Sequence, residues 1–169
     1  MSRTERSAQV RLLKIDALTG EILWECQSAI KGKYASKSAA AGSYAGLMAS
    51  PLVGEGDIND LVIFNVNRVE LDDKSVCAVV YALDKETGEE VWNFNLHRYA
   101  WSTPVLVYDE NNLGTLLIGD SAGTLYMIDA RSGMLKDKVE LGANIEATPA
   151  VFDDMLVVGT RGQKIFGVK

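Results

Sequence analysis

The chain has little of what metal and redox sites require. Its 169 residues include one histidine, His97, and two cysteines, Cys26 and Cys77. The cysteines stand in neither a metal-type nor a redox-type spacing, so the sequence indicates no site of either kind. Because cysteine behaves as a small apolar residue on strands, we expect two buried thiols in preference to a disulfide. A general base needs an acid or nucleophile beside it, and we expect His97, in a short connection, to be an exposed turn residue instead.

Basic residues and long apolar runs are also scarce. The 17 Lys and Arg residues are outnumbered by 23 Asp and Glu residues, which gives a net charge of −6. Nucleic-acid binding depends on Lys and Arg clusters that displace counterions, so we expect no nucleic-acid partner. A membrane-spanning helix needs roughly 18 or more apolar residues in succession. No run approaches that length, so we expect no membrane span in this chain.

Helical periodicity is missing as well. No window places apolar residues at the helical period over a useful length, whereas short apolar runs alternate with turn signals. One run, residues 60–65, is continuous enough to be a strand buried on both faces, and further strands are expected at 101–108 and 147–152. The composition, 47% hydrophobic and 24% charged, is ordinary for a globular domain. The sequence therefore predicts an all-β fold.

One short motif occurs more than once. Residues 82–92 read Ala-Leu-Asp-Lys-Glu-Thr-Gly-Glu-Glu-Val-Trp, which predicts a strand, a tight turn and a strand. Residues 14–24 repeat the spacing of aspartate, Thr-Gly and tryptophan, residues 127–133 repeat the first half, and a fourth copy begins at 165–169. The aspartate side chain accepts bonds from backbone N–H groups two residues on, and glycine adopts positive φ without steric cost. Each copy therefore predicts a hairpin that depends most on its glycine.

Two sets of landmarks give the length of the repeat. The turn glycines are 68 and 45 residues apart, and the prolines that precede the next strands are 53 and 45 apart. Periods of about 40 to 45 residues with four short strands each are typical of β-propeller blades. We attribute the longer first interval to polar segments at 28–49 and 67–75, which we expect to be loops.

The expected fold is a partial β-propeller of four-stranded antiparallel blades, with strands A to D in chain order. After a polar leader at 1–9, residues 10–27 form a partial blade, 48–96 and 100–141 form full blades, and 146–169 form a second partial blade. Propellers protect their sheet edges by radial repetition around a channel. We therefore expect the chain to be part of a larger propeller or to self-associate through its unfinished blade edges.

The pattern Ala-x-Asp-x-x-Thr-Gly-x-x-x-Trp, complete at residues 82–92, resembles the tryptophan-docking repeat of the pyrroloquinoline quinone (PQQ) repeat family. The resemblance covers the chain from about Val10 onward. It implies that the tryptophan of strand D packs between neighbouring blades, with its indole N–H bonded to the backbone. The residues expected in this structural role are Trp24, Trp92, Asp16, Asp84, Asp129, Gly20, Gly88 and Gly133. The third copy departs from the pattern because Asp137 stands where the tryptophan is expected, so that blade must make its outer contact differently.

Fold alone does not give function. The family includes quinone-dependent alcohol dehydrogenases, outer-membrane assembly lipoproteins that act as scaffolds, and extracytoplasmic proteins of unknown role. The enzymes imply a calcium-held quinone, a catalytic aspartate and commonly a vicinal cysteine pair, which this chain lacks. The resemblance favours a non-enzymatic binding or scaffold domain, the C-terminal portion of a larger extracytoplasmic protein in the cell envelope or secreted. It implies no cofactor, and a protein or an extracellular polymer as partner. The alternatives are a PQQ-dependent dehydrogenase-like domain with PQQ and calcium, and a spacer.

Strand A lines the channel of a propeller, so residues at its start converge on one face with the B-to-C turns. Five residues there are candidates to surround a small ligand or peptide: Trp101, Asp120, Asn144, Glu146 and Arg161. The competing interpretation is structural, with Arg161 and Glu146 paired between blades and Trp101 filling the channel. No metal ligands are expected.

Two further segments have a functional and a plain interpretation. Residues 57–60 resemble the start of a calcium loop but lack its later acidic ligand and glycine, so we expect an ordinary hairpin turn. The long segment 28–49 carries residues suited to an anionic or peptide partner, although a solvated loop is the default expectation. Those residues are Lys31, Lys33, Lys37, Tyr34 and Tyr44.

Overall fold

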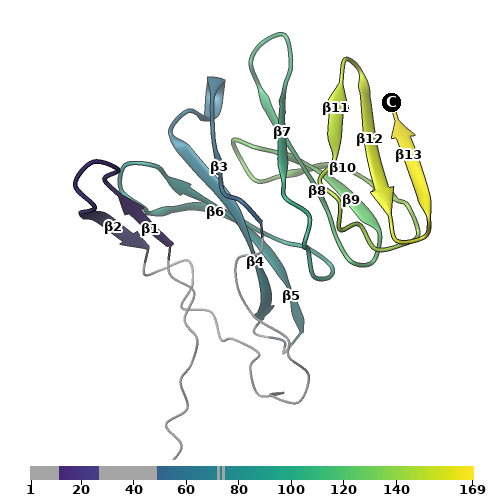
Figure 1. The fold of residues 1–169 in the computed structure, drawn as a ribbon, viewed down its shortest axis with the longest axis horizontal. Helices are drawn as coiled ribbons and strands as arrows, with labels where there is room; N and C mark the ends of the chain where they lie inside the picture. The colour runs from purple at the N-terminus through teal and green to yellow at the C-terminus, as the bar shows by residue number, and fades with distance from the viewer. Residues whose placement is uncertain (1–11, 27–48, 72, 74) are drawn as a thin grey trace, which may run out of the picture.

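The computed structural model describes residues 12–26, 49–71, 73 and 75–169. The expected leader at 1–9 and nearly all of the loop at 28–49, with its lysines and tyrosines, lie outside the described residues. Within the described part the fold is all-β, as predicted, and four antiparallel sheets stand side by side in chain order (Figure 1). No helix of that part is long and apolar enough to cross a membrane.

The strands follow the blade pattern A to D. The first sheet is the hairpin of β1 (Leu12–Ile15) and β2 (Ile22–Cys26). The second sheet contains β3 (Leu52–Val53), β4 (Leu61–Glu70), β5 (Val76–Asp84) and β6 (Glu90–Asn95). The third contains β7 (Val105–Tyr108), β8 (Gly114–Gly119), β9 (Thr124–Asp129) and β10 (Leu135–Glu140), and the last β11 (Ala150–Phe152), β12 (Met155–Thr160) and β13 (Lys164–Val168). Two full four-stranded blades between partial blades confirm the predicted fold class.

Three local predictions were wrong. The segment 67–75 is not a loop, because β4 continues to Glu70 and pairs Val69 with Cys77; only its last residues turn. The polar Asn67 misled the prediction, but its Oδ1 is buried and accepts a bond from Ala100 N at 2.8 Å. Strands β7 and β11 begin later than predicted, each after a proline, which has no N–H to donate to a sheet.

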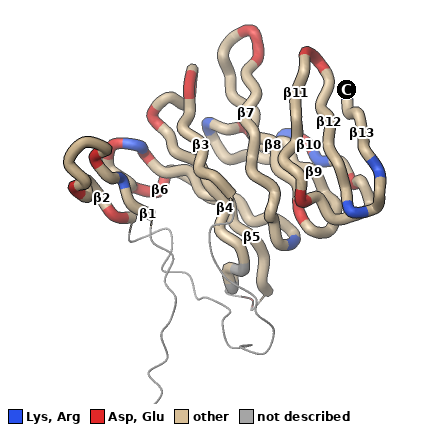
Figure 2. Tube along the Cα trace, in the orientation of Figure 1, with Lys and Arg blue, Asp and Glu red and all other residues tan. Residues whose placement is uncertain are grey.

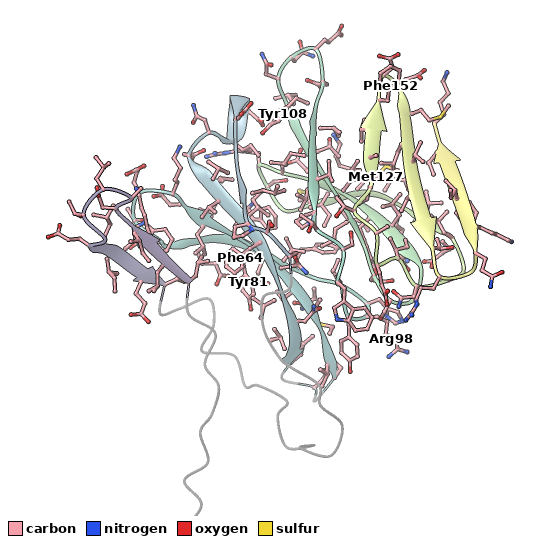
Figure 3. All side chains as sticks on the ribbon, viewed as in Figure 1. Phe64, Tyr81, Arg98, Tyr108, Met127 and Phe152 are labelled. Carbon is pink, nitrogen blue, oxygen red and sulfur yellow. The ribbon has the colours of Figure 1, made fainter. Side chains whose placement is uncertain are left out.

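Alternate side chains of each strand point to opposite faces, so neighbouring sheets share a core. In β4, Leu61 and Ile63 pack with residues of β8 and β9, whereas Phe64 packs with residues of the β1–β2 hairpin. Phe64 stacks on Tyr81 of β5, with ring centroids 5.7 Å apart (Figure 3). Cys26 and Cys77 are buried free thiols in the same core. A third core, between the last two sheets, contains Leu117, Leu125, Ile145, Leu156 and Val158.

The three copies of the repeated motif form the same turn between strands C and D. In each turn the aspartate N–H and C=O both bond to the backbone across the loop, as between Asp84 N and Glu89 O at 2.8 Å. The Asp84 carboxylate accepts bonds from the N–H groups of Glu86 and Thr87, at 2.9 and 2.7 Å. The glycines adopt φ of 76°, 74° and 72° at Gly20, Gly88 and Gly133. We call this turn the aspartate clamp: the aspartate bonds to backbone groups across the loop, and a glycine with positive φ closes the turn.

Each docking tryptophan lies on the clamp of the next blade. Trp24 of β2 donates from Nε1 to Lys85 O at 3.1 Å, and Trp92 of β6 donates to Ala130 O at 3.1 Å. A Cβ added to Gly88 would lie 2.7 Å from the Trp24 ring, and one added to Gly133 would lie 2.7 Å from the Trp92 ring. Glycine is thus needed twice at these turns, for its φ and for the close approach of the indole.

Gly20 provides a matched comparison for Gly88. It has the same positive φ, but a Cβ added there meets nothing within 4 Å. We expect Gly20→Ala to lower the free energy of unfolding by about 1 kcal/mol, through backbone strain alone. Gly88→Ala should cost about 2 kcal/mol more, because it also displaces the indole. Urea unfolding of both variants measures the difference, and equal losses would contradict the docking role of Gly88.

The clamps also predict how stability depends on pH. Bonds from the backbone N–H of Thr87 and then of Glu86 lower the pKa of Asp84, and bonds from Thr19 and Leu18 do the same at Asp16. A carboxylate whose pKa is lower in the folded state stabilises the fold above its unfolded pKa, about 3.9, and loses that contribution as the pH falls below it. Below about pH 4 we expect the Tm of Asp84→Asn to fall less steeply with decreasing pH than the Tm of the unsubstituted protein. Glu89→Gln changes a side chain on the same turn that does not bond to Asp84, because Glu89 takes part in the clamp only through its backbone oxygen. This variant should leave the slope unchanged, and an equal effect of both variants would contradict the assignment.

Candidate functional site

Three of the five predicted ligand-binding residues form one exposed polar cluster. Glu146 Oε1 accepts a bond from Asn144 Nδ2 at 3.0 Å and pairs with Arg161 Nη1 at 3.2 Å. The Arg161 side chain remains 69% exposed and that of Glu146 40% exposed. Arg161 lies on the turn between β12 and β13, and Glu146 lies in the connection that leads into the same sheet. The pair therefore holds one blade to its own entry segment, and it leaves donor atoms on the surface.

Asp120 does not belong to this exposed cluster. Its side chain is fully buried, and its Oδ1 accepts bonds from Ala122 N and Thr124 N at 2.9 and 3.0 Å. Its Oδ2 accepts the Tyr126 hydroxyl at 3.0 Å, and the same hydroxyl oxygen accepts a bond from His97 N at 3.0 Å. Burial raises the pKa of Tyr126 to about 12. The Asp120 carboxylate therefore holds the turn after β8, and the Tyr126 hydroxyl that it binds links this turn to the end of the preceding blade.

Trp101 lies on the same edge of the molecule as the polar cluster. It is half-buried, and its ring lies 6.3 Å from that of Tyr99 at an angle of 56°. Arg98, labelled in Figure 3 at this edge, is exposed next to the aromatic pair, as is His97. The exposed position of His97 agrees with the expectation of a turn residue.

Backbone bonds explain why these residues share an edge. The connection that leaves each full blade accepts an N–H from the B-to-C turn of the next blade. Tyr99 O accepts Ser121 N at 2.7 Å, and Asn144 O accepts Arg161 N at 2.9 Å. The B-to-C turns and the entries to strand A are therefore held together, as the blade topology predicts. We call this edge the entry edge; it presents Arg98, Tyr99, Trp101, Asn144, Glu146 and Arg161.

Sequence reasoning missed the polar contacts between blades. Arg131 Nη1 pairs with Asp60 Oδ1 at 2.6 Å, and the Arg131 guanidinium lowers the pKa of Asp60. Lys14 pairs with Glu86 at 2.7 Å, from one clamp-bearing blade to the next. Asp57 Oδ1 accepts Gly114 N at 2.9 Å, so the acidic segment 57–60, which overlaps η1 (Gly56–Ile58), serves as a contact to the next blade. Partners 57 to 72 residues apart leave no local pattern in a sequence.

The carboxylates of the described residues do not form the ligand set that a calcium-held quinone needs. Calcium takes six to eight oxygen ligands, among them carboxylates. In the described part of the chain no group of three or more His, Cys, Asp or Glu side chains is placed to hold a metal ion. The candidate carboxylates are already engaged, Asp120 by three donors and Glu146 by Arg161. The alternative of a PQQ and calcium centre therefore finds no ligand set among these residues.

Comparisons with solved structures agree with this architecture. BamB from Moraxella catarrhalis superposes with a TM-score of 0.60 at 22% identity, over 94% of this chain and 39% of that one. The computationally designed Ika8 protein gives 0.57 at 16% identity, over 93% and 39%, and the designed Ika4 protein gives 0.55 at 16%, over 94% and 78%. At these identities the likeness shows the fold.

Two curated relatives match about half of the chain. Beta-alanine-activating enzyme of Mus musculus is 28% identical over 89 residues, and that of Homo sapiens is 24% identical over 81 residues. These matches take in 52% and 47% of this chain, but only 8% and 7% of the relatives' own length.

A family model described as "Outer membrane protein assembly factor BamB" matches residues 77–169, more than half of the chain. The matched part contains two of the three aspartate clamps, the Trp92 dock and the last two sheets. Together with the blade topology, this match shows that the chain belongs to the PQQ-repeat propeller family whose model carries that description.

Proposed function

We propose that the chain is a non-enzymatic binding domain that holds a protein partner through its entry edge, within a larger extracytoplasmic protein. The observation that carries the proposal is the half-buried Trp101 together with the exposed Arg161 and Glu146 on an edge held by backbone hydrogen bonds. Half-buried aromatic residues and arginine are the side chains that most often dominate protein interfaces. The family supports a scaffold or assembly role, because its model is described by an assembly factor.

The arrangement of charge at the entry edge suits a polar protein surface. Arg161 has one carboxylate partner and stays largely exposed, so its remaining N–H groups are available to a carboxylate or carbonyl of a partner. Residues held by the blade framework need little ordering on binding, which reduces the entropic cost of association. An extracellular polymer is the second partner class, and the proposed localisation in the envelope is supported by the family resemblance alone.

Cross-linking at defined positions tests the proposal. A photo-reactive residue at position 98 should capture a specific protein partner in cell extracts, and purified partner should then bind with a measurable Kd. We expect the double variant Trp101→Ala, Arg161→Glu to weaken that Kd by about 100-fold, about 2.7 kcal/mol. The matched control is Val53→Ala together with Glu21→Lys, which changes exposed residues away from the entry edge.

Two results would contradict this function. If the entry-edge variant and the control variant bound the partner with equal affinity, the entry edge would not be the binding surface. Saturable, stoichiometric binding of PQQ in the presence of calcium, seen as a change in absorbance and a rise in Tm, would favour the dehydrogenase-like alternative instead.

A further inference from the structure

The entry edge presents hydrogen-bond donors that are not used within the fold. Each docking tryptophan donates its indole N–H to a backbone oxygen of the next blade, whereas Trp101 Nε1 makes no such bond within residues 12–26, 49–71, 73 and 75–169. Arg98 is exposed, and its guanidinium has no described ion pair or hydrogen bond in the same part of the chain. Arg161 uses only Nη1, for its bond to Glu146. The remaining donors can be satisfied by acceptors of a partner.

Acceptors are few at this edge. Glu146 is its one carboxylate among the six residues that define the edge, and Oε1 of Glu146 already accepts bonds from Asn144 and Arg161. Asn144 Oδ1 is buried, so it is not presented to a partner. Two arginines against one glutamate give the entry edge a net positive charge, although the whole chain carries −6. The edge therefore favours a ligand that is negatively charged and rich in acceptors.

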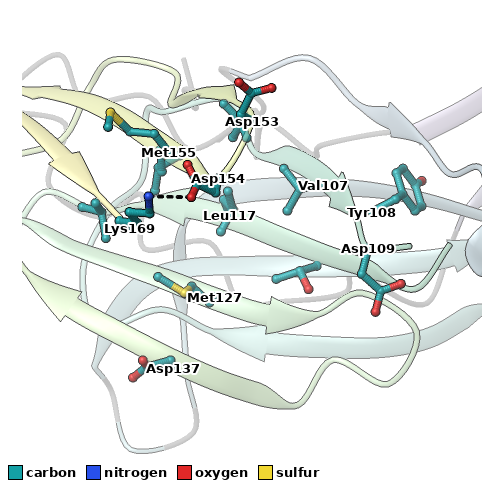
Figure 4. A pocket seen from close by; sticks show the side chains of 14 residues that line it. Val107, Tyr108, Asp109, Leu117, Met127, Asp137, Asp153, Asp154, Met155 and Lys169 are labelled. Carbon is teal, nitrogen blue, oxygen red and sulfur yellow. Dashed lines mark ion pairs between the residues drawn. The ribbon is translucent and has the colours of Figure 1, made fainter. Parts of the chain in front are cut away.

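The other ends of the strands have the opposite charge. Figure 2 shows acidic residues on the turns that follow β3, β7 and β11. Three of these residues, Asp109, Asp153 and Asp154, are drawn in Figure 4, where Lys169 pairs with Asp154 at 2.7 Å. An acidic partner is repelled by these turns and attracted to the entry edge, so charge orients its approach.

Backbone bonds fix the segment that carries Arg98 and the aromatic pair. Arg98 O accepts Ala78 N at 3.0 Å. Ala100 N donates to Asn67 Oδ1 at 2.8 Å, and Ala100 O accepts Asn65 Nδ2 at 2.9 Å, from two buried side chains of β4. This segment lies at the ends of the strands, whereas neighbouring blades pack on the faces of the sheets. The surface is thus preorganised, and binding costs little backbone entropy.

We propose that the entry edge binds an acidic segment of a partner protein, with Asp or Glu side chains on either side of an apolar one. The carboxylates accept N–H groups of Arg98 and Arg161, and the apolar side chain lies against the ring of Trp101. Tryptophan and arginine are the residues that most often dominate protein interfaces. The inference rests on the proposed function, because it gives the chemistry of the protein partner that the same edge holds.

The probe is the peptide acetyl-Glu-Asp-Leu-Asp-Glu-amide, titrated into the protein and followed by the NMR signals of the indole N–H groups. The Trp101 signal should shift saturably, with a Kd of about 0.1 to 1 mM. The signals of Trp24 and Trp92 should stay in place, because their indoles are bonded between blades. The neutral peptide acetyl-Gln-Asn-Leu-Asn-Gln-amide should bind about tenfold or more weakly.

Two variants that each remove one positive charge separate contact from general electrostatics. Arg98→Gln removes a side chain with no described partner, so it should weaken peptide binding about tenfold without loss of a folded contact. Lys136→Gln removes a charge from β10, where Lys136 bonds to Thr115 Oγ1 at 3.0 Å, and should leave the Kd unchanged.

Three results would overturn the acidic assignment: no saturable shift of the Trp101 signal, equal binding of the neutral peptide, or equal losses in Arg98→Gln and Lys136→Gln. Tighter binding of polygalacturonate than of the acidic peptide, seen at the Trp101 signal, would also overturn it, in favour of an anionic polymer. The proposed function is decided separately, by whether the cross-linked partner distinguishes the entry-edge variant from its control.

Discussion

The arrangement of the first three sheets depends on one repeated contact, an indole that lies on the glycine of the next blade's turn. The contact combines a hydrogen bond, from Trp92 Nε1 to Ala130 O, with ring packing at a distance that only glycine permits. It also requires the aspartate clamp, because Asp129 bonds to Ser132 and holds the glycine in its left-handed conformation. The aspartate and the glycine of the motif thus shape their own hairpin turn, whereas the tryptophan acts across the interface to the next blade.

The difference between local features and contacts across blades explains what could be predicted from the sequence. The clamp, the tryptophan spacing and the blade period are local or periodic, so the all-β blade order followed from them. The extension of β4 could not be predicted, because Asn67 is polar in sequence and its buried Oδ1 is paired only with the backbone N–H of Ala100, 33 residues away. The burial of Asp120 could not be predicted either, since the Tyr126 hydroxyl that it binds and the His97 N–H are brought together only by packing. Candidate residues on the entry edge were found because topology places them there.

The two ends of the blades differ chemically. The entry edge is tied by backbone bonds between successive blades and presents arginine beside aromatic residues. The opposite edge carries acidic turns, and a groove lined by apolar residues and four aspartates lies between the last two sheets.

Unfolding of two matched tryptophan variants tests most directly whether the indole contact carries the architecture. Trp92 docks between blades, whereas Trp101 is half-buried on the entry edge and docks on no clamp. We expect Trp92→Ala to lower the free energy of unfolding by about 3 to 5 kcal/mol, and Trp101→Ala by less than about 1.5 kcal/mol. Equal losses for the two variants would contradict the account.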